Sequence, residues 1–422
     1  PLVTNAYDAK IDGIYYNFIS ENEAEVTSGD EDDYDDDGYT YYSGIVVIPA
    51  SVTYDDKTYT VTCIGDEAFY GCSSLTSINI PNSVTSIGDE AFYGCSGLTS
   101  IKVEEGNITY DSRDNCNAII ETAANTLIAG CQNTIIPNTV TSIGNNAFAN
   151  CSGLTEVTIP ESVTSISDGA FSDCENLTKV TIESNAVMSP IIEEDDEGSD
   201  TYYRPMADIF GRQVETYILG DAITCISDYA FSYCENLTSI DIPNGVTSIG
   251  ESAFSGCNSL KSITIPEDVT SIGESAFEDC SSLTKVTIDS NALMSPITAE
   301  DDEGSYTYYR NMADIFGRQV VTYILGDAIT CIGDYAFYDC ENLTSIDIPN
   351  GVTSIGESAF SWCYDLTSIN IPNSVTSIGE SAFSGCSSLK AITIPEGVTS
   401  IENGALYGCS SLKAITIPEG VS

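Results

Sequence analysis

The sequence of 422 residues contains no histidine and only 13 lysine and arginine residues, against 64 aspartate and glutamate residues. The absence of histidine removes the usual imidazole base, the commonest zinc ligand and every Ser-His or Cys-His nucleophile pair. The formal net charge of −51 excludes nucleic acid as a partner, because binding to phosphates requires basic side chains that displace counterions.

Long apolar runs and common catalytic motifs are also missing. No stretch approaches the roughly 18 uninterrupted apolar residues of a spanning helix, so we expect no membrane insertion. The sequence contains no GxxxxGK[ST], GxSxG or CxxC motif. With a hydrophobic content of 42%, it can nevertheless bury a large core. These observations predict a globular protein that is not an enzyme and has no cofactor, except for a weak calcium site considered below.

A repeat of 23 residues runs through most of the chain. One unit opens at Leu75 with LTSINIPNSVTSIGDEAFYGCSG, and the same frame restarts at Leu98 (98 − 75 = 23). The β-branched segment LTSINIP predicts a strand that ends at its proline, and VTSIG predicts a second short strand. AFYGC predicts a single helical turn, and the acidic residues before it suit the positive end of the turn's dipole.

A single unit cannot fold alone. Its eight apolar positions bury too little surface to offset the conformational entropy of ordering 23 residues, so neighbouring units must stack and share one core. The predicted fold is an α+β repeat solenoid, a curved right-handed coil of short strands and single-turn helices. We expect residues 43–422 to form 14 complete coils and a partial C-terminal coil, with long insertions in units 98–130, 177–213 and 283–319.

Residues 1–42 precede the repeats and differ from them. GIYYNFI, EAEVTS and YTYYSG predict strands of a hairpin-like β cap around an acidic loop. Residues 1–6, PLVTNA, are similar to the small-residue region before a signal-peptidase site.

The unit LxxIxIPxxVTxIGxxAFxxC resembles the BspA-like leucine-rich repeats, similar to the Treponema pallidum type, of surface and secreted proteins of Bacteroidetes and some protists. The resemblance covers Ser43 to Ser422, and the irregular stretch from Tyr110 to Cys131 is similar to the degenerate unit that these proteins often contain. It implies a leucine-rich-repeat solenoid, a secreted or cell-surface location, and adhesion or protein binding without shared catalytic residues.

Eleven of the 16 cysteines occupy one position of the repeat, which favours a ladder of buried thiols. Of the other five, three precede the ladder cysteine of their own coil by nine residues (63 to 72, 225 to 234, 331 to 340), and two share the irregular unit. Because secreted proteins form disulfides, we hypothesise that some of these pairs are oxidised. The pairs are Cys63 with Cys72, Cys225 with Cys234, Cys331 with Cys340, and Cys116 with Cys131.

Acidic runs occur at residues 30–37, 193–197 and 300–303. DYDDDG at residues 33–38 matches the start of a calcium loop, with Asp33, Asp35 and Asp37 as the ligands, but its twelfth position is Gly44 instead of a bidentate acid. Weak calcium binding is one hypothesis, and a solvated loop is the alternative.

Two long insertions have nearly the same sequence. They begin at Ser184 and Ser290, 106 residues apart (290 − 184 = 106), and each contains Tyr-Tyr-Arg. Tyrosine and arginine are enriched in binding hot spots, which makes these residues candidates for ligand binding. The alternative is that a duplicated segment carried its loop along and the aromatics only pack the loop down. The candidates are Tyr202, Tyr203, Arg204, Tyr308, Tyr309 and Arg310.

A repeat array without catalytic motifs favours a binding function. We therefore expect a non-enzymatic extracellular or cell-surface binding protein, an adhesin or host-interaction module whose partners are proteins or glycans at a host or bacterial surface. The alternative is a structural surface protein that self-associates through an open strand edge. The net charge of −51 opposes such dense packing unless cations bridge the acidic groups.

Overall fold

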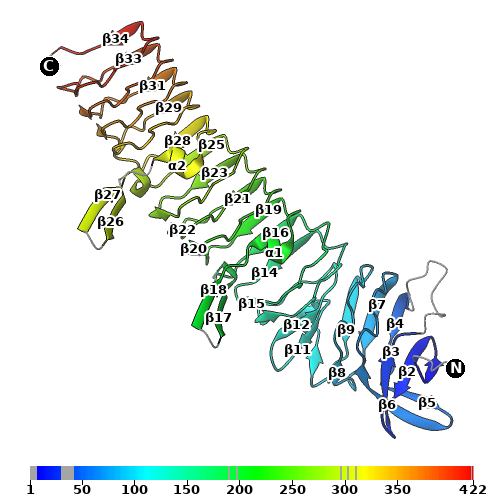
Figure 1. Ribbon diagram of the computed structural model, residues 1–422. Helices are drawn as coiled ribbons and strands as arrows, with labels where there is room; N and C mark the ends of the chain where they lie inside the picture. The colour runs from blue at the N-terminus through cyan, green and yellow to red at the C-terminus, as the bar shows by residue number, and fades with distance from the viewer. Residues whose placement is uncertain are drawn as a thin grey trace. The chain divides into compact units, whose positions relative to one another are not determined.

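The computed structural model describes residues 7–29, 42–188, 191–195, 198–294, 297–301, 304–308, 311–419 and 421. Contacts divide the chain into two compact units, which are described separately below. The first consists of Pro1–Val187 with Asp208–Val214, and the second of Met188–Ala207 with Glu215–Ser422. The ribbon in Figure 1 labels the strands and helices of both.

The first unit opens with an antiparallel sheet of β1 (Ala9–Ile11), β2 (Ile14–Phe18) and β3 (Glu23–Thr27). Strands β2 and β3 lie where GIYYNFI and EAEVTS predicted them, whereas residues 39–41 of the third expected strand lie outside the described residues. Strand β3 pairs in parallel with β6 (Lys57–Ile64), which also pairs with β5 (Ser51–Tyr54) and with β8 (Ser86–Ile87). The cap sheet therefore continues directly into the first coils.

Short parallel strands then form the walls of the coils. Where no insertion intervenes, paired residues differ by 23 in number, as in Ile78 and Ile101, so the strand register follows the sequence repeat. The remaining strands of this unit are β4 (Gly44–Val47), β7 (Leu75–Ile80), β9 (Ser100–Val103), β10 (Tyr110–Asp111), β11 (Ile119–Glu121), β12 (Thr126–Ala129), β13 (Ser142–Ile143), β14 (Glu156–Ile159), β15 (Ser165–Ile166) and β16 (Lys179–Ile182), with a 3₁₀ helix at Arg113–Asn115.

The second unit repeats this architecture and adds two hairpins. Its wall strands are β19 (Thr216–Leu219), β20 (Cys225–Ile226), β21 (Ser239–Asp241), β22 (Ser248–Ile249), β23 (Ser262–Ile265), β24 (Ser271–Ile272), β25 (Lys285–Ile288), β28 (Thr322–Leu325), β29 (Ser345–Asp347), β30 (Ser354–Ile355), β31 (Ser368–Asn370), β32 (Ser377–Ile378), β33 (Ala391–Thr393) and β34 (Ala414–Thr416). The hairpins are β17 (Ile191–Asp195) with β18 (Gly198–Tyr202), and β26 (Ile297–Asp301) with β27 (Gly304–Tyr308). The helical elements near the insertions are α1 (Met206–Phe210), α2 (Met312–Phe316) and 3₁₀ turns at Ala186–Met188 and Ala292–Met294.

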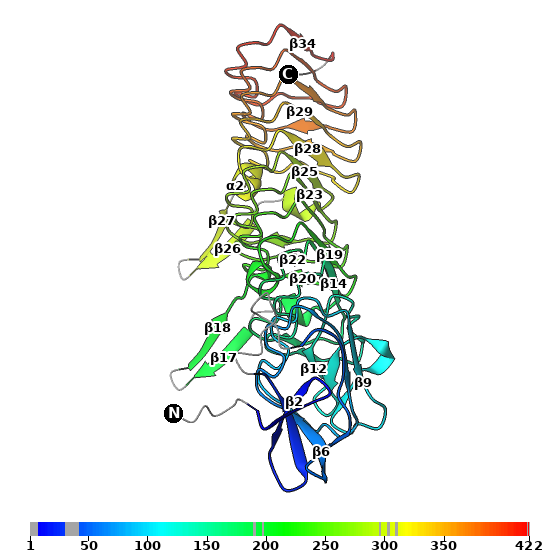
Figure 2. The same cartoon turned by 90° about the vertical axis from the view of Figure 1, so that its right-hand side faces the viewer.

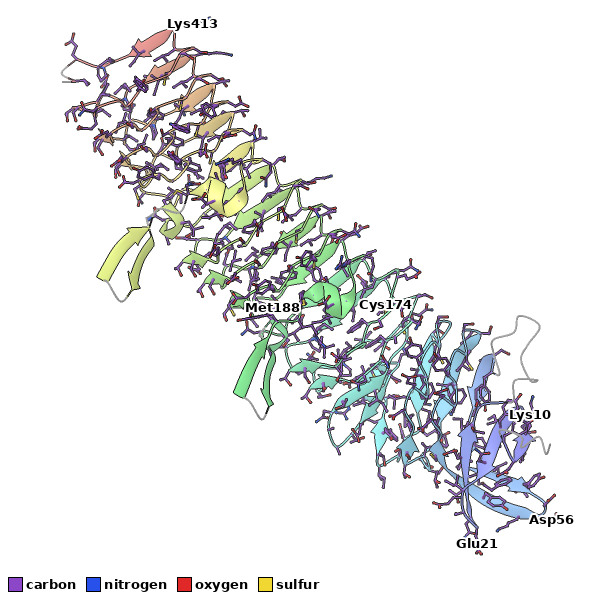
Figure 3. The ribbon with its side chains drawn as sticks, viewed as in Figure 1. Lys10, Glu21, Asp56, Cys174, Met188 and Lys413 are labelled. Carbon is purple, nitrogen blue, oxygen red and sulfur yellow. The ribbon has the colours of Figure 1, made fainter. Side chains whose placement is uncertain are left out.

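Figure 3 shows the side chains on the ribbon. The core of each unit is a set of buried side-chain ladders that pass from coil to coil. In the second unit the buried ring of Phe254 stacks between Phe231 and Phe277, with ring centroids 5.3 and 5.1 Å apart. Where the second insertion interrupts the coil, α2 supplies the next ring, and Phe316 lies 4.9 Å from Phe277. Because each ring contacts its neighbours above and below, the phenylalanine of AFxxC couples successive coils.

The AFxxC segment forms consecutive turns instead of the helical turn expected from the sequence. The N–H of Tyr70 donates to the carbonyl of Glu67, and that of Cys72 to the carbonyl of Phe69, at 2.9 and 3.1 Å. Glu67 has a φ of 53° and Gly71 a φ of 68°. These left-handed residues interrupt a regular helix, so the segment remains a series of turns.

An aspartate and a glycine join neighbouring coils at these turns. Oδ1 of Asp334 accepts a hydrogen bond from the N–H of Glu357 in the next coil at 2.7 Å. A Cβ on Gly356 would lie 2.4 Å from that oxygen, so the glycine of VTSIG leaves room for the carboxylate. Asp228 with Gly250 and Asp66 with Gly88 repeat the arrangement. At these positions the acidic group bonds to the neighbouring coil, not to the start of its own turn.

Candidate binding surfaces

The two insertions form matching hairpins in the second unit. Ile191 pairs with Tyr202 in the first, and Ile297 pairs with Tyr308 in the second, with the same antiparallel register. Figures 1 and 2 both show β17–β18 and β26–β27 projecting from the same side of the coils. The insertions therefore place two similar β-ribbons outside the stack.

The first Tyr-Tyr-Arg segment returns the chain from its hairpin to the coil. Tyr202 ends β18, and the ring of Tyr203 lies 5.6 Å from the ring of Tyr229. A hydrogen bond to Asp228 raises the pKa of Tyr203 above its ordinary value. Tyr203 thus packs on the coil, as the alternative interpretation expects, and Arg204 beside it is half-buried.

The second Tyr-Tyr-Arg segment is described only in part. Tyr308 ends β27, while Tyr309 and Arg310 lie outside the described residues. The structure therefore does not bring the six candidate residues together in one site, and their role in ligand binding stays a prediction.

The sequence MADIFGRQ, which follows the hairpin in both insertions, returns the chain to the stacked coils. In the second copy, Asn311 and Asp314 form a reciprocal capping box at the start of α2. The amide of Gln319 then donates to the carbonyls of Cys280 and Phe316, at 3.1 and 2.8 Å. These bonds fix the base of the second hairpin to the coil.

Four aromatic residues form a second surface feature of the same unit, which we call the aromatic patch: Tyr335, Tyr338, Trp362 and Tyr364. Ring centroids are 5.7 Å apart for Tyr335 and Tyr338, 6.0 Å for Tyr338 and Trp362, and 6.3 Å for Trp362 and Tyr364. Trp362 and Tyr364 are 47% and 41% exposed, so the patch presents ring surface to solvent. The 23-residue repeat did not predict this patch, because its members occupy different positions of the repeat.

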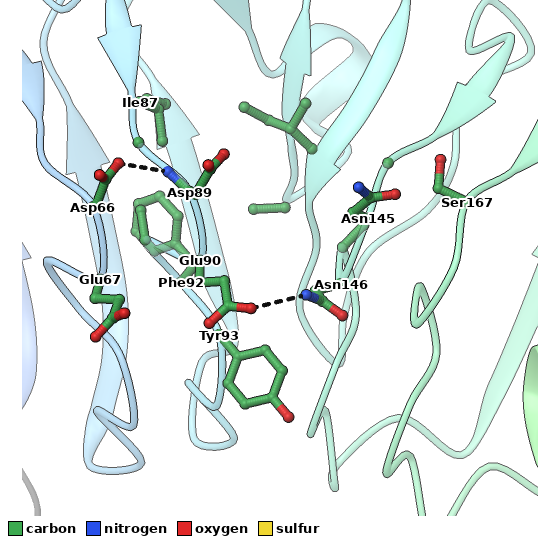
Figure 4. A pocket seen from close by; sticks show the side chains of 16 residues that line it. Asp66, Glu67, Ile87, Asp89, Glu90, Phe92, Tyr93, Asn145, Asn146 and Ser167 are labelled. Carbon is green, nitrogen blue, oxygen red and sulfur yellow. Dashed lines mark hydrogen bonds between the residues drawn. The ribbon is translucent and has the colours of Figure 1, made fainter.

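A cleft of about 660 Å³ lies in the first unit, where the irregular unit 98–130 has no AFxxC segment (Figure 4). With that part of the ladder missing, Phe92 is only partly buried and lines the cleft. The amide of Asn146 donates to Glu90 across it at 3.4 Å, and Asp66 accepts from the N–H of Asp89 at 2.9 Å. The lining combines carboxylates and amides with apolar side chains, which suits contact with a polar ligand. The interrupted repeat was the sequence signal for it.

The cysteine ladder is packed as the repeat predicts. Ten of its eleven members are buried, and Cys409 is half-buried. A ladder thiol donates to the phenylalanine carbonyl of the preceding coil, as in Cys257 to Phe231 at 3.2 Å. Burial raises the pKa of Cys174 and Cys386 to about 12, which keeps these thiols protonated at neutral pH.

The off-ladder cysteines lie in separate environments, and all 16 cysteines are thiols in the structure. Cys63 donates to a carboxylate oxygen of Glu25 at 3.3 Å, while Cys225 and Cys331 are half-buried. In the irregular unit Cys116 donates to the carbonyl of Ala118 and Cys131 to that of Asn117. None of the four hypothesised pairs is joined in this structure.

Oxidation of these cysteine pairs stays a prediction. If it occurs, peptide mass spectrometry without reduction will detect the cross-linked peptides of Cys116 with Cys131 or of an off-ladder cysteine with its ladder neighbour. Recovery of alkylated thiols only, from protein denatured in the presence of the alkylating agent, would end the hypothesis.

The calcium hypothesis concerns Asp33, Asp35 and Asp37, which lie outside the described residues. Within the described ranges, no group of three or more acidic or cysteine side chains could hold a metal ion. Calcium binding by residues 33–37 therefore stays a prediction, for which calorimetric titration is the test.

Comparison with solved structures finds other bacterial repeat proteins. A leucine-rich repeat protein from Bacteroides ovatus is 28% identical with a TM-score of 0.43, over 99% of this chain and 90% of that one. A leucine-rich cell surface protein from Faecalibacterium prausnitzii is 26% identical with a TM-score of 0.27, over 97% and 94%. The leucine-rich repeat protein of Treponema pallidum is 17% identical with a TM-score of 0.20, over 90% of each chain. No curated protein matches the sequence.

The family follows from the sequence repeats themselves. The model of the BspA-type leucine-rich repeat region matches six copies, at residues 51–123, 120–190, 211–299 and 316–422. Repeats of this kind are generally non-enzymatic scaffolds of surface and protein-interaction modules. Among the described residues, no helix is long and apolar enough to cross a membrane. Since the matches cover most of the coils, as the motif LxxIxIPxxVTxIGxxAFxxC predicted, the chain belongs to the BspA-type leucine-rich-repeat family.

Proposed function

We propose that this protein is a non-enzymatic binding protein of the cell surface or extracellular space, which captures protein partners as an adhesin or host-interaction module. The observation that carries the proposal is the pair of hairpins β17–β18 and β26–β27, which project from one side of the second unit (Figure 2). Two similar ribbons on one side offer a partner two contacts at once, and linked contacts raise the overall affinity.

The bases of the hairpins support this role. The N–H of Met206 donates to the carbonyl of Ala230 at 2.7 Å, and the N–H of Met312 donates to that of Ala336 at 2.8 Å. The two ribbons are therefore anchored to the coils at equivalent positions. Anchoring lowers the conformational entropy that a partner's binding would otherwise have to offset.

Replacing the tyrosines of the two Tyr-Tyr-Arg segments tests the proposal. We expect the combined change of Tyr202, Tyr203, Tyr308 and Tyr309 to serine to lower capture of extracellular proteins at least tenfold, because tyrosines dominate many interfaces. The measurement is a pull-down with the full chain from host extracellular extract and from lysate of the producing cell, read by mass spectrometry.

The matched control is Tyr407→Ser, because Tyr407 is 78% exposed but belongs to a different coil from the insertions. Circular dichroism must show the same fold for both variants. Capture that is unchanged in the four-tyrosine variant would contradict the role of the hairpins. Recovery mainly of the protein's own copies would favour the alternative, a self-associating structural protein.

A further inference from the structure

The aromatic patch of the second unit has the chemistry of a cation-binding surface. We propose that Tyr335, Tyr338, Trp362 and Tyr364, with the carboxylates around them, bind an arginine-rich segment of a protein partner. The proposal rests on the binding function proposed above and names the chemical class of the partner. Two observations carry it: a difference between the duplicated segments and the local charge.

The patch occurs in only one of the two duplicated segments. Subtracting the offset of 106 residues places Ser232, Gly256 and Asn258 at the positions of Tyr338, Trp362 and Tyr364. Three separate positions of the repeat therefore carry aromatic rings in the second copy and small or polar side chains in the first. Because the three rings contact one another in sequence along the surface, the differences form one feature.

Trp362 adopts a backbone conformation that side chains of its size rarely take. Its φ is 66°, and the same position is left-handed in other coils too, with φ values of 74° at Gly256, 61° at Asp339 and 59° at Tyr233. A left-handed conformation costs a non-glycine residue roughly 1–2 kcal/mol. Since the side chain is 47% exposed, burial only partly offsets that cost. The coil therefore sets this conformation, and glycine is the residue that adopts it at the least cost.

The charged residues around the patch are mainly acidic. Between Arg318 and Lys390 the sequence contains eight acidic residues and no lysine or arginine. Asp339 and Glu341 lie one repeat before Trp362 and Tyr364 (362 − 339 = 364 − 341 = 23), which places them in the adjacent coil. The hydroxyl of Tyr335 donates to a carboxylate oxygen of Glu357 at 2.7 Å and holds that group beside the rings.

The chain's own Arg318 shows that a guanidinium fits at this edge, because it pairs with the carboxylate of Asp339. Arginine stacks on aromatic faces and bonds to carboxylates, and the patch offers both kinds of group. A neutral glycan would gain from the rings but not from the surrounding charge. A second copy of this chain, with a net charge of −51, would be repelled.

The fluorescence of Trp362 gives a direct measurement, because it is the only tryptophan in the chain. We expect an eight-residue peptide of alternating glycine and arginine to produce a saturable change in this fluorescence, and the apparent affinity to fall as salt is raised. The matching lysine peptide should bind more weakly, since lysine is a compact charge that does not stack as a planar group. A glycine–glutamate peptide should produce no change.

The first copy of the duplication supplies the matched variant. The variant places the first copy's residues in the second copy through three substitutions: Tyr338→Ser, Trp362→Gly and Tyr364→Asn. We expect calorimetry to show that it binds the arginine peptide at least tenfold more weakly than the unchanged protein. The reverse set, Ser232→Tyr, Gly256→Trp and Asn258→Tyr, should create a second binding site. Circular dichroism confirms that each variant is folded.

Three results would overturn the inference: no binding of the arginine peptide, equal binding by the variant with the first copy's residues, or a fluorescence response to a neutral oligosaccharide in place of the peptide. Because the probe is a defined peptide, the two proposals can fail separately. Peptide binding that fails while protein capture persists would refute only the patch. Capture that fails while the peptide binds would refute only the role of the hairpins.

Discussion

Replacing Phe254 with alanine is expected to lower the free energy of unfolding of the second unit by about 3–5 kcal/mol, the usual range for a fully buried phenylalanine. The side chain is 0% exposed, and its ring lies between those of Phe231 and Phe277. Its removal leaves a cavity between three coils and breaks two ring contacts. Chemical denaturation followed by circular dichroism measures the loss.

Phe92→Ala is the matched control for this prediction. Phe92 occupies the same position of the repeat but is only partly buried beside the cleft, and it stacks on Phe69 at 5.3 Å. We expect its loss to be clearly smaller, because less surface is buried and the cavity opens to solvent. Equal losses at the two sites would show that the ladder does not transmit stability from coil to coil.

Alkaline pH is expected to lower the free energy of unfolding, because the unfolded chain can ionise thiols that the folded chain keeps buried and neutral. Burial raises the pKa of Cys174 and Cys386 from 9.0 to about 12, and it raises those of Cys95 and Cys363 well above 9.0. A hydrogen bond with Cys280, together with burial, raises the pKa of Cys257 well above 9.0. The unfolded chain releases these protons near pH 9, whereas the folded chain retains them. The stability that depends on the neutral thiols is thus complete below pH 9 and is lost as pH rises from about 9 to 12.

The slope of this loss is large, because each such thiol contributes up to about 1.4 kcal/mol per pH unit. Urea unfolding at a series of pH values between 7 and 11 measures it. Changing Cys174 and Cys386 to alanine should reduce the slope, although the cavities lower stability at pH 7. A free energy of unfolding that stays level up to pH 11 would contradict the burial of the thiols.

Periodicity predicted the parts of the fold that depend on which side chains face inward. The 23-residue frame placed Ile78 opposite Ile101, and it predicted the cysteine ladder. The turn at AFxxC was not predictable in the same way. Glu67 and Glu90 adopt left-handed conformations there. Glutamate does not indicate such a conformation as glycine would, so the sequence favoured a helical turn where the structure has consecutive turns.

The binding surfaces were predicted less completely than the fold. The two insertions were identified from their nearly identical sequences. Their hairpin structure was not predicted, because the acidic residues at the tips have weak strand propensity. Tyr338 and Trp362 lie 24 residues apart (362 − 338 = 24), so only the register of the coils brings their rings into contact. Comparing the two copies at the offset of 106 residues would have singled them out.

The regular step between coils also bears on how such a protein changes its length over evolution. Each coil presents phenylalanine and cysteine to the neighbour on either side, so one coil fits against the next without a newly adapted interface. Gain or loss of a 106-residue segment within one gene therefore adds or removes a ribbon and its coils without leaving an unmatched surface. The new copy keeps the old contacts, while its exposed positions are free to diverge, as the residues at 338, 362 and 364 have done.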